Sequence, residues 1–304
     1  MTVSEYLEYC ARELDREGLC FGHGTDNPRD EAAWLVSASL GIPVQALAGA
    51  AGEELEPSVA QHAEKLLRAR IETRQPLAYL LGEAWFCGLR FEVNADVLVP
   101  RSPFAELIAD RFHPWMDARE VTRALDLCTG SGCIAIALAK HLPWMQVDAS
   151  DISPAALAVA DRNRRLHDLE SRVALVQSDL FEALANRRYE LIVSNPPYVA
   201  RRAYEGLPRE YLAEPALGLI SPGQGLELPL RILAQAPEHL APDGQLFCEV
   251  GESAGALEYL LPDLPFTWLQ FKHGGDGVIT IGRADLMRHR PAVVRALENL
   301  NDVL

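Results

Sequence analysis

From about residue 123 onward the chain alternates between apolar runs and helical patterns, and this alternation restricts the fold more than any other feature. Strand-like runs are expected at residues 123–128, 146–151, 172–179, 189–195 and 244–250. Helical patterns separate them at 132–142, 153–168 and about 225–241. Such alternation predicts an α/β fold with a parallel, doubly wound, Rossmann-like sheet, because right-handed crossovers place helices on both of its faces.

The last part of the α/β pattern differs from the rest. The runs at 266–272 and 277–284 are joined by the Gly-rich segment HGGDG, which is typical of a hairpin turn. We therefore expect a terminal antiparallel strand pair at one edge of the sheet.

The first 84 residues have helical spacing and no strand pattern. Val3, Tyr6, Cys10 and Leu14 recur at the period of one helix face, and further helices are expected at 26–41 and 57–76. Alternating apolar and polar residues then predict a hairpin-like linker at 85–98. The expected organisation is a small helical domain at 1–84, the linker at 85–98 and the α/β domain at 99–304.

The charge of the chain limits its partners. The net charge is −15; residues 1–98 hold 16 acidic and 8 basic side chains and the remainder 27 and 20, so both parts are acidic. The basic clusters at 161–167 and 201–209 are short and are interpreted as solvated faces. An acidic surface repels DNA and favours a basic protein as partner.

Several classes of site and location are not expected. The six cysteines contain no CxxC pair and the eight histidines no HExxH motif, so no structural or catalytic metal is predicted. No apolar run approaches the roughly 18 residues that a membrane span needs, and the N-terminus is polar and acidic. We expect a soluble, cytoplasmic protein.

A Gly-rich turn follows the first strand of the α/β part. In LDLCTGSGCIAIA (125–137), Gly130 and Gly132 permit close approach of a ligand to the backbone, and the following helix presents free N–H groups. Asp151 ends the next strand, where a carboxylate can bind both hydroxyls of a ribose. The turn also fits the G-x-G-x-x-A pattern of dinucleotide enzymes, so it does not by itself identify the ligand.

Carboxylates near the turn favour a methyl donor. Asp126 would repel a pyrophosphate but attract an ammonium, and S-adenosyl-L-methionine carries an ammonium, a sulfonium and no phosphate. A bracing or helix-capping role for Asp126 remains an alternative. Asp179 is expected at the adenine edge and Leu180 on its face. The expected cofactor-binding residues are Asp126, Thr129, Gly130, Gly132, Asp151, Asp179, Leu180 and Asn195.

Asn195-Pro196-Pro197-Tyr198 ends the fourth strand, on the same sheet edge as the glycine turn. Prolines cannot donate to a ladder and hold the preceding residue extended, so Asn195 Oδ1 and the Pro196 carbonyl are free, fixed acceptors. Such a pair, with the face of Tyr198, matches a planar NH₂ group. Asn195, Pro196 and Tyr198 are therefore the predicted catalytic residues. The alternative is a strand exit that is merely stiffened by proline.

These residues carry a resemblance that covers nearly the whole chain. VLVPRSPFAELI (97–108), LDLCTGSGCIAIALA (125–139), SDLF (178–181), SNPPYV (194–199) and HGGDG (273–277) resemble the class I methyltransferases, specifically the N5-glutamine methyltransferases related to HemK. The resemblance implies S-adenosyl-L-methionine as donor and a glutamine side-chain amide as acceptor. It implies a substrate site formed by Arg101, Phe104, Asn195, Pro196, Pro197 and Tyr198.

The segment after the linker distinguishes two branches of this family. The release-factor branch usually reads PRPDTE there, whereas this chain has PRSP at 100–103 followed by Glu106-Leu107. With HGTDNPRDEAAWL (23–35), it is similar to the branch that methylates the third large-subunit ribosomal protein. Phe104-Ala105 departs from the smaller aliphatic residue and glycine expected there. Release factors remain an alternative substrate. A nucleic-acid amino-methyltransferase and a nucleotide-binding module without activity are weaker alternatives.

Overall fold

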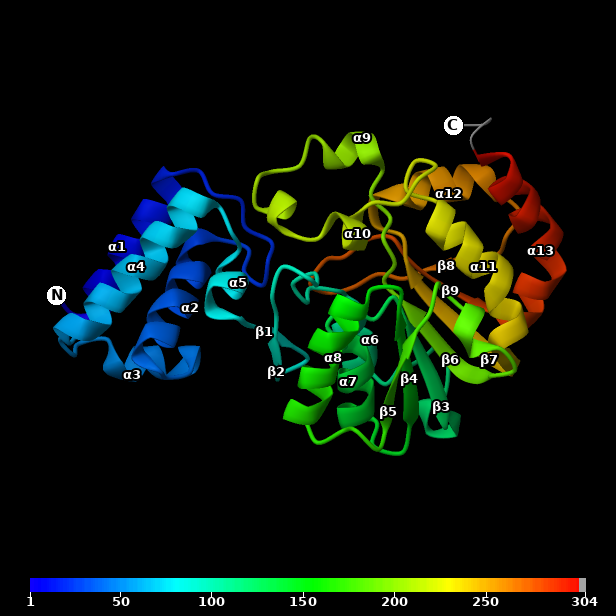
Figure 1. Cartoon of the computed structure of the whole chain (residues 1–304), viewed down its shortest axis with the longest axis horizontal. Helices are drawn as coiled ribbons and strands as arrows, with labels where there is room; N and C mark the ends of the chain where they lie inside the picture. The colour runs from blue at the N-terminus through cyan, green and yellow to red at the C-terminus, as the bar shows by residue number, and fades with distance from the viewer. Residues whose placement is uncertain (301–304) are drawn as a thin grey trace.

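The N-terminal segments with helical periodicity form a helix bundle in the computed structural model, which describes residues 1–300 (Figure 1). Thr2 and Glu5 form a capping box at the start of the first helix, and Asn27 caps the second, which ends at Gly41 with φ +68°. The three helices expected from the sequence are confirmed. The bundle comprises α1 (Val3–Arg16), α2 (Pro28–Leu40), η1 (Val44–Ala46), α3 (Leu47–Ala50), α4 (Pro57–Thr73) and α5 (Leu77–Leu81).

A two-stranded antiparallel hairpin joins the bundle to the rest of the chain. It consists of β1 (Glu83–Phe86) and β2 (Leu89–Glu92), so it begins two residues earlier and ends six residues earlier than the interval expected from the sequence. The Asn163 side chain accepts a 2.7 Å hydrogen bond from the Glu92 N–H and donates one of 2.9 Å to the Glu92 carbonyl. These bonds fix the hairpin to helix α8 (Pro154–Leu166) of the α/β part. Residues 93–103 then run toward the edge of the large sheet.

The α/β part contains one seven-stranded sheet in the order β5-β4-β3-β6-β7-β9-β8. Strands β3 to β7 of this sheet are parallel, as the alternation predicts, and the order reverses between β3 and β6. Ligands bind at such a reversal, outside the carboxyl ends of the strands. The strands are β3 (Arg123–Leu127), β4 (Gln146–Asp151), β5 (Val173–Gln177), β6 (Tyr189–Ser194), β7 (Leu240–Glu249), β8 (Thr267–Trp268) and β9 (Val278–Gly282).

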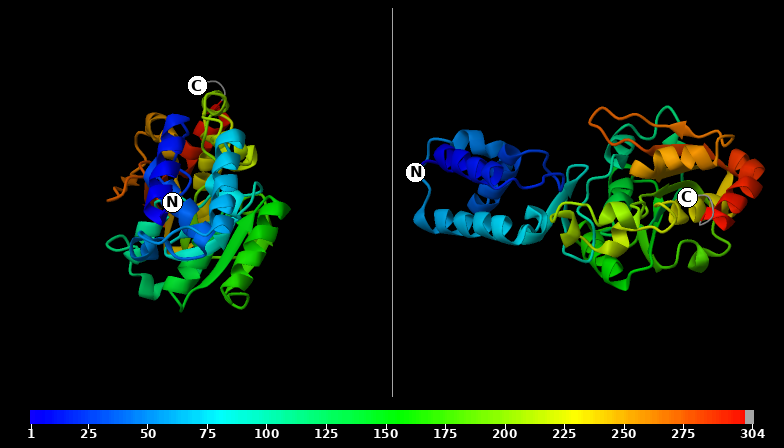
Figure 2. Two further views of the ribbon diagram at one scale, coloured as in Figure 1. Left: turned by 90° about the vertical axis from the view of Figure 1, so that its left-hand side faces the viewer. Right: turned by 90° about the horizontal axis from the view of Figure 1, so that it is seen from above.

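Two separate apolar cores cover the faces of this sheet. Helices α6 and α7 contribute to one core with Phe247 and Val193, and α11, α12 and α13 contribute to the other with Ile192 and Leu246. Figures 1 and 2 show these helices on the two sides of the strands. The helices are α6 (Phe104–Ala109), η2 (Ala118–Glu120), α7 (Cys133–His141), α8 (Pro154–Leu166), η3 (Glu182–Leu184), α9 (Arg201–Tyr204), η4 (Tyr211–Ala213), α10 (Ala216–Leu219), α11 (Glu227–His239), η5 (Gly251–Ser253), α12 (Ala254–Leu260) and α13 (Arg283–Glu298).

The closing hairpin is confirmed, because β9 lies antiparallel between β7 and β8. Its first strand spans only two residues, and the second ends at Gly282, where α13 begins. Helix α13 was not predicted from the sequence, since Pro291 and its charged neighbours interrupt the apolar pattern that identifies a helix. Within residues 1–300 no single helix is long and apolar enough to cross a membrane. The bent pair Pro28–Leu40 and Val44–Ala50 meets the length and composition criteria for a span only when the two helices are counted together.

Candidate active site

A cavity of about 510 Å³ lies at the carboxyl ends of β3, β4 and β6. This volume suits a nucleoside-sized ligand. The glycine turn and the Asn-Pro-Pro-Tyr segment, which are more than 60 residues apart in the sequence, line the same cavity. The predicted site residues that line it are Arg101, Thr129, Gly130, Asp151, Asp179, Leu180, Asn195, Pro196, Pro197 and Tyr198.

Asp151 organises the glycine turn. Its Oδ2 accepts a 2.8 Å hydrogen bond from the Gly130 N–H, and its Oδ1 accepts one of 2.9 Å from Ser153. Gly130 has φ +55° and open space where a Cβ would lie, so the backbone faces the cavity without a side chain in between. Burial raises the pKa of Asp151, and the backbone donors partly oppose this. A carboxylate with unused lone pairs thus faces the cavity.

Asp126 lies beneath the turn, and it is not among the residues that line the cavity. Its Oδ2 accepts hydrogen bonds from the Thr129 hydroxyl and from the Ala135 N–H of α7, while Oδ1 has no partner among the described residues. Burial raises the pKa of Asp126 to about 7. The direct ammonium contact expected from the sequence is therefore replaced by the bracing and capping role that was its alternative.

Two other predicted residues also lie outside the cavity lining. Gly132 has φ +80° and packs against α8, since a Cβ there would lie 3.1 Å from the Ala160 Cβ. Phe104 is fully buried in the core between α6 and the sheet. The prediction that Phe104 lines the substrate pocket is corrected on this point, because the helix that begins at this residue turns its ring inward.

The positive charges that line the cavity are both paired. Arg231 lies 2.9 Å from Asp179, and Arg101 forms two hydrogen bonds, of 2.6 and 2.7 Å, with Glu214. They are the only Lys or Arg side chains among the lining residues that the structure describes. Both guanidinium groups are thus already paired with carboxylates of the chain itself. Asp179, predicted at an adenine edge, has one oxygen bound to Arg231.

The Asn-Pro-Pro-Tyr segment leaves β6 directly at the cavity. The Ser194 hydroxyl, just before it, donates 2.8 Å to the Leu127 carbonyl and so joins the ends of β6 and β3. Among residues 1–300, neither the Asn195 side chain nor the Pro196 carbonyl has a hydrogen-bond partner, although both residues line the cavity. Two acceptors beside the glycine turn are therefore available to a ligand with a planar NH₂ group.

Sequence reasoning missed the residues that hold Tyr198. Its hydroxyl donates 2.8 Å to Glu249 Oε1, and the Ser102 hydroxyl donates 2.7 Å to Glu249 Oε2. Gly251 contacts the ring, because a Cβ there would lie 2.4 Å from Tyr198 Cε2. A carboxylate directly after the apolar run of β7, at the same sheet edge, was the available signal for Glu249.

Glu214, in the loop after Tyr198, is a second buried carboxylate at this site. Unlike Glu249, it is not indicated by any pattern in the sequence. It accepts hydrogen bonds from the Val99 N–H at 2.9 Å and from Arg101, and its Oε2 lies 3.3 Å from His23 Nε2. Burial alone would raise the pKa of Glu214, but His23 and Arg101 outweigh it and lower the pKa to about 2. This carboxylate connects the helical bundle, the segment after the linker and the loop.

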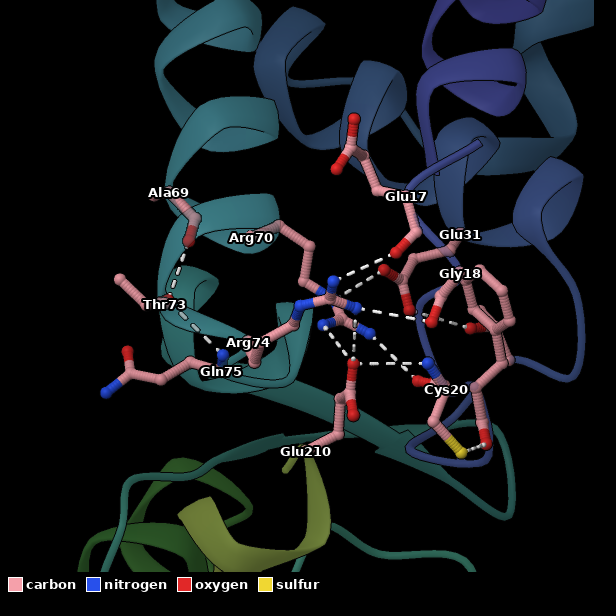
Figure 3. A network of polar contacts seen from close by, with 12 residues as sticks. Glu17, Gly18, Cys20, Glu31, Ala69, Arg70, Thr73, Arg74, Gln75 and Glu210 are labelled. Atoms are coloured by element: carbon pink, nitrogen blue, oxygen red, sulfur yellow. Dashed lines mark hydrogen bonds and ion pairs between the residues drawn. The ribbon is translucent and has the colours of Figure 1, made fainter. Parts of the chain in front are cut away.

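Glu210 makes a similar connection nearby. Figure 3 shows Arg70 of α4 and Arg74, which directly follows this helix, pointing toward Glu210 and Cys20. Glu210 Oε1 accepts 3.1 Å from the Cys20 N–H and lies 3.6 and 3.4 Å from the two guanidinium groups. Arg70 is fully buried and also donates 2.7 Å to Glu31. The helical bundle is thus fixed to the α/β part through buried ion pairs.

Two family models and several curated relatives match this chain. The Methyltransferase small domain model matches residues 109–226, and the PrmC N-terminal domain model matches residues 8–82. A ribosomal protein uL3 glutamine methyltransferase of Xanthomonas campestris pv. campestris is 49% identical over 95% of this chain and 93% of its own. One of Xylella fastidiosa is 45% identical over 96% and 93%. A solved methyltransferase of Pyrococcus furiosus aligns at 20% identity and a TM-score of 0.47, over 71% of this chain and 97% of that one.

Proposed function

Since this chain belongs to the family of the ribosomal protein uL3 glutamine methyltransferases, we propose that it methylates the side-chain amide of a glutamine in ribosomal protein uL3. One observation supports this most: Asn195 and Pro196 present two unpartnered acceptors to the same cavity as the glycine turn. Such a pair fits the two hydrogens of an amide NH₂ and would bind neither an ester nor a thiol as well.

The residues present fit S-adenosyl-L-methionine, the methyl donor of this class of enzymes. The Asp151 carboxylate would accept hydrogen bonds from the ribose hydroxyls, and Leu180 would pack on the adenine. The Gly130 turn would lie against the methionine end of the donor. When bound, the donor supplies a methyl group on a sulfonium.

The Asn195-Pro196-Pro197-Tyr198 segment, which we call the clamp, would orient the acceptor. An amide nitrogen is a poor nucleophile because its lone pair is delocalised, so positioning is the main contribution that the protein can make. Asn195 Oδ1 and the Pro196 carbonyl accept the two N–H groups and fix the nitrogen. Both bind it more strongly as it gains positive charge, which stabilises the transition state more than the ground state. Tyr198 supplies an aromatic face, and its hydroxyl is held by Glu249.

The charge of the chain supports a protein substrate of opposite sign. The net charge of −15 attracts a basic ribosomal protein and repels DNA. We propose that the helical region, residues 1–84, contributes to substrate recognition, that 85–98 links it to the catalytic part, 99–304, and that the protein acts in the cytoplasm. This division rests on the change of element type along the chain.

Labelled methyl transfer tests the proposal. Unmethylated uL3, a release factor and DNA are incubated side by side with the protein and donor, and mass spectrometry locates the label. Label on a glutamine of uL3 is the expected result. Label on the release factor alone would replace the proposed substrate by another protein, and label on DNA alone would overturn the proposed chemistry.

A further inference from the structure

The segment directly after the Asn-Pro-Pro-Tyr clamp forms a closed loop, residues 199–220, which we call the strap. Val199 bridges Ile220: the Val199 N–H donates 2.8 Å to the Leu219 carbonyl and the Ser221 N–H donates 3.0 Å to the Val199 carbonyl. The strap contains α9 and α10 and lies between the helical bundle and the sheet (Figure 1). Its start adjoins Tyr198, so its position and that of the clamp are directly linked.

One side of the strap forms part of the cavity wall. Pro215, Leu217 and Gly218 line the cavity, and Gly218 packs against Leu98, since a Cβ there would lie 3.1 Å from Leu98 Cγ. Leu217 is 60% exposed although it lies at the cavity. A large apolar side chain in this place does not contribute to the core, but it suits contact with a bound chain.

Two carboxylates, Glu210 and Glu214, hold the strap to the helical bundle. Each of these residues is only 3% exposed, but the two have different bonding partners. Glu210 pairs with α4 and with the backbone of Cys20, away from the cavity lining. Glu214 bonds to Val99 and Arg101, and both of these residues line the cavity.

We propose that the part of the strap that lines the cavity, at Pro215, Leu217 and Gly218, is the wall on which the protein substrate lies, with Leu217 contacting the chain beside the target glutamine, and that Glu214 positions this wall. The inference rests on the proposed protein-glutamine transfer and extends it to the residues that recognise the substrate chain. Glu214 touches neither donor nor acceptor. It acts through Val99 and Arg101, which it holds against the strap, and through His23 of the bundle.

Two exposed leucines provide a matched test of the contact. Leu217→Ser and Leu212→Ser each shorten an exposed leucine of the strap, 60% and 44% exposed, but only Leu217 lines the cavity. Leu217→Ser is expected to raise KM for the protein substrate about tenfold, as the loss of an apolar anchor does, with kcat little changed. Leu212→Ser should stay within about twofold. Equal KM values for the two variants would overturn the contact.

Two buried glutamates test the positioning role. Glu214→Gln and Glu210→Gln each remove one buried negative charge that faces cations, so both should lower Tm to a similar extent. Glu214→Gln is expected to lower kcat/KM for the protein substrate by about tenfold or more, because a small displacement of the wall misplaces the amide. Donor affinity, measured by calorimetry, should be unchanged. Equal kcat/KM losses in both variants would show a purely structural role and overturn the proposal.

The unaltered protein separates this proposal from the proposed substrate. If it labels the release factor and not uL3, the proposed substrate fails, and the four variants are compared on the release factor, where the same predictions apply. If it labels no protein, both proposals fail. If it labels uL3 and the variants match their controls, only the role of the strap fails.

Discussion

The hydroxyl of Tyr198 donates a 2.8 Å hydrogen bond to Glu249 Oε1 at the end of β7. The other oxygen of Glu249 accepts 2.7 Å from Ser102, so the segment after the linker and the end of β7 jointly fix the phenol of the clamp. Burial raises the pKa of Glu249, and both hydroxyl donors oppose the rise. The clamp is therefore held on one side by its prolines and on the other by this carboxylate.

Substitution of Gly251 should disturb the clamp without touching a polar group. Gly251→Ala places a Cβ 2.4 Å from Tyr198 Cε2 at a residue with φ +45°, so the ring must move. Because reactivity depends on placement, kcat should fall about tenfold or more. Gly255→Ala is the control, since a Cβ at Gly255 meets nothing within 4 Å. The methyl-transfer rate of each variant is measured, and the melting temperature of each shows whether a lower rate reflects unfolding. A normal rate for Gly251→Ala would contradict the prediction.

Asn195→Ala removes one of the two acceptors of the clamp. The side chain of Asn195 has no partner among residues 1–300, so its loss leaves no internal group unsatisfied and should not lower stability. Transfer should fall more than about 100-fold, as when a transition-state hydrogen-bond partner is lost. Donor affinity, measured by calorimetry, should stay nearly intact. Unchanged turnover would remove Asn195 from the mechanism.

Asp151→Ala should act on the donor. Asp151 holds the Gly130 and Ser153 N–H groups and faces the cavity, so the substitution removes the support of the turn together with the proposed ribose contact. The Kd for S-adenosyl-L-methionine should rise about tenfold or more, corresponding to the loss of at least one hydrogen bond to a charged group. Asp161→Ala on α8, which removes surface ion pairs with Arg164 and Arg165, is the control. Equal donor affinity in the two variants would contradict the role of Asp151.

Periodic features could be predicted from the sequence, and long-range partners could not. The strands and helices of the parallel sheet were predictable because each carries its own apolar period. The glycine turn and Asn195 meet because parallel strands end at one edge, which the alternation already implies. Glu214 had no such signal: it is a charge in a loop, and its partner Arg101 lies 113 residues away in the sequence.

Two misplaced residues show a second limit. Phe104 follows PRSP directly, but closeness to a motif does not determine the direction of a side chain at the start of a helix, and its ring enters the core. Asp126 was open to two interpretations, since a carboxylate before a glycine turn can face a ligand or cap the next helix. Only the hydrogen bonds from Thr129 and Ala135 distinguish them.

The bracing role of Asp126 leads to a prediction about pH and stability. Burial raises the pKa of Asp126 from 3.8 to about 7, with a further rise from Asp151 and opposition from its two donors. Between these values the folded protein retains a proton that the unfolded chain releases, so this group's contribution to stability is complete below pH 3.8 and is lost as pH rises toward 7. Above about pH 7 the loss is complete.

Asp126→Asn should abolish this dependence, because the amide does not ionise and its oxygen can still accept from Thr129 and Ala135. The free energy of unfolding is measured in urea at pH 4, 5, 6, 7 and 8 without donor. Relative to the unaltered protein, the variant should gain stability progressively up to about pH 7, by at most about 4 kcal/mol. The difference should then stay constant at pH 8. Parallel pH profiles would mean that Asp126 is ionised in the fold over the whole range, and its unpartnered Oδ1 would then need a cation or water that stabilises the charge.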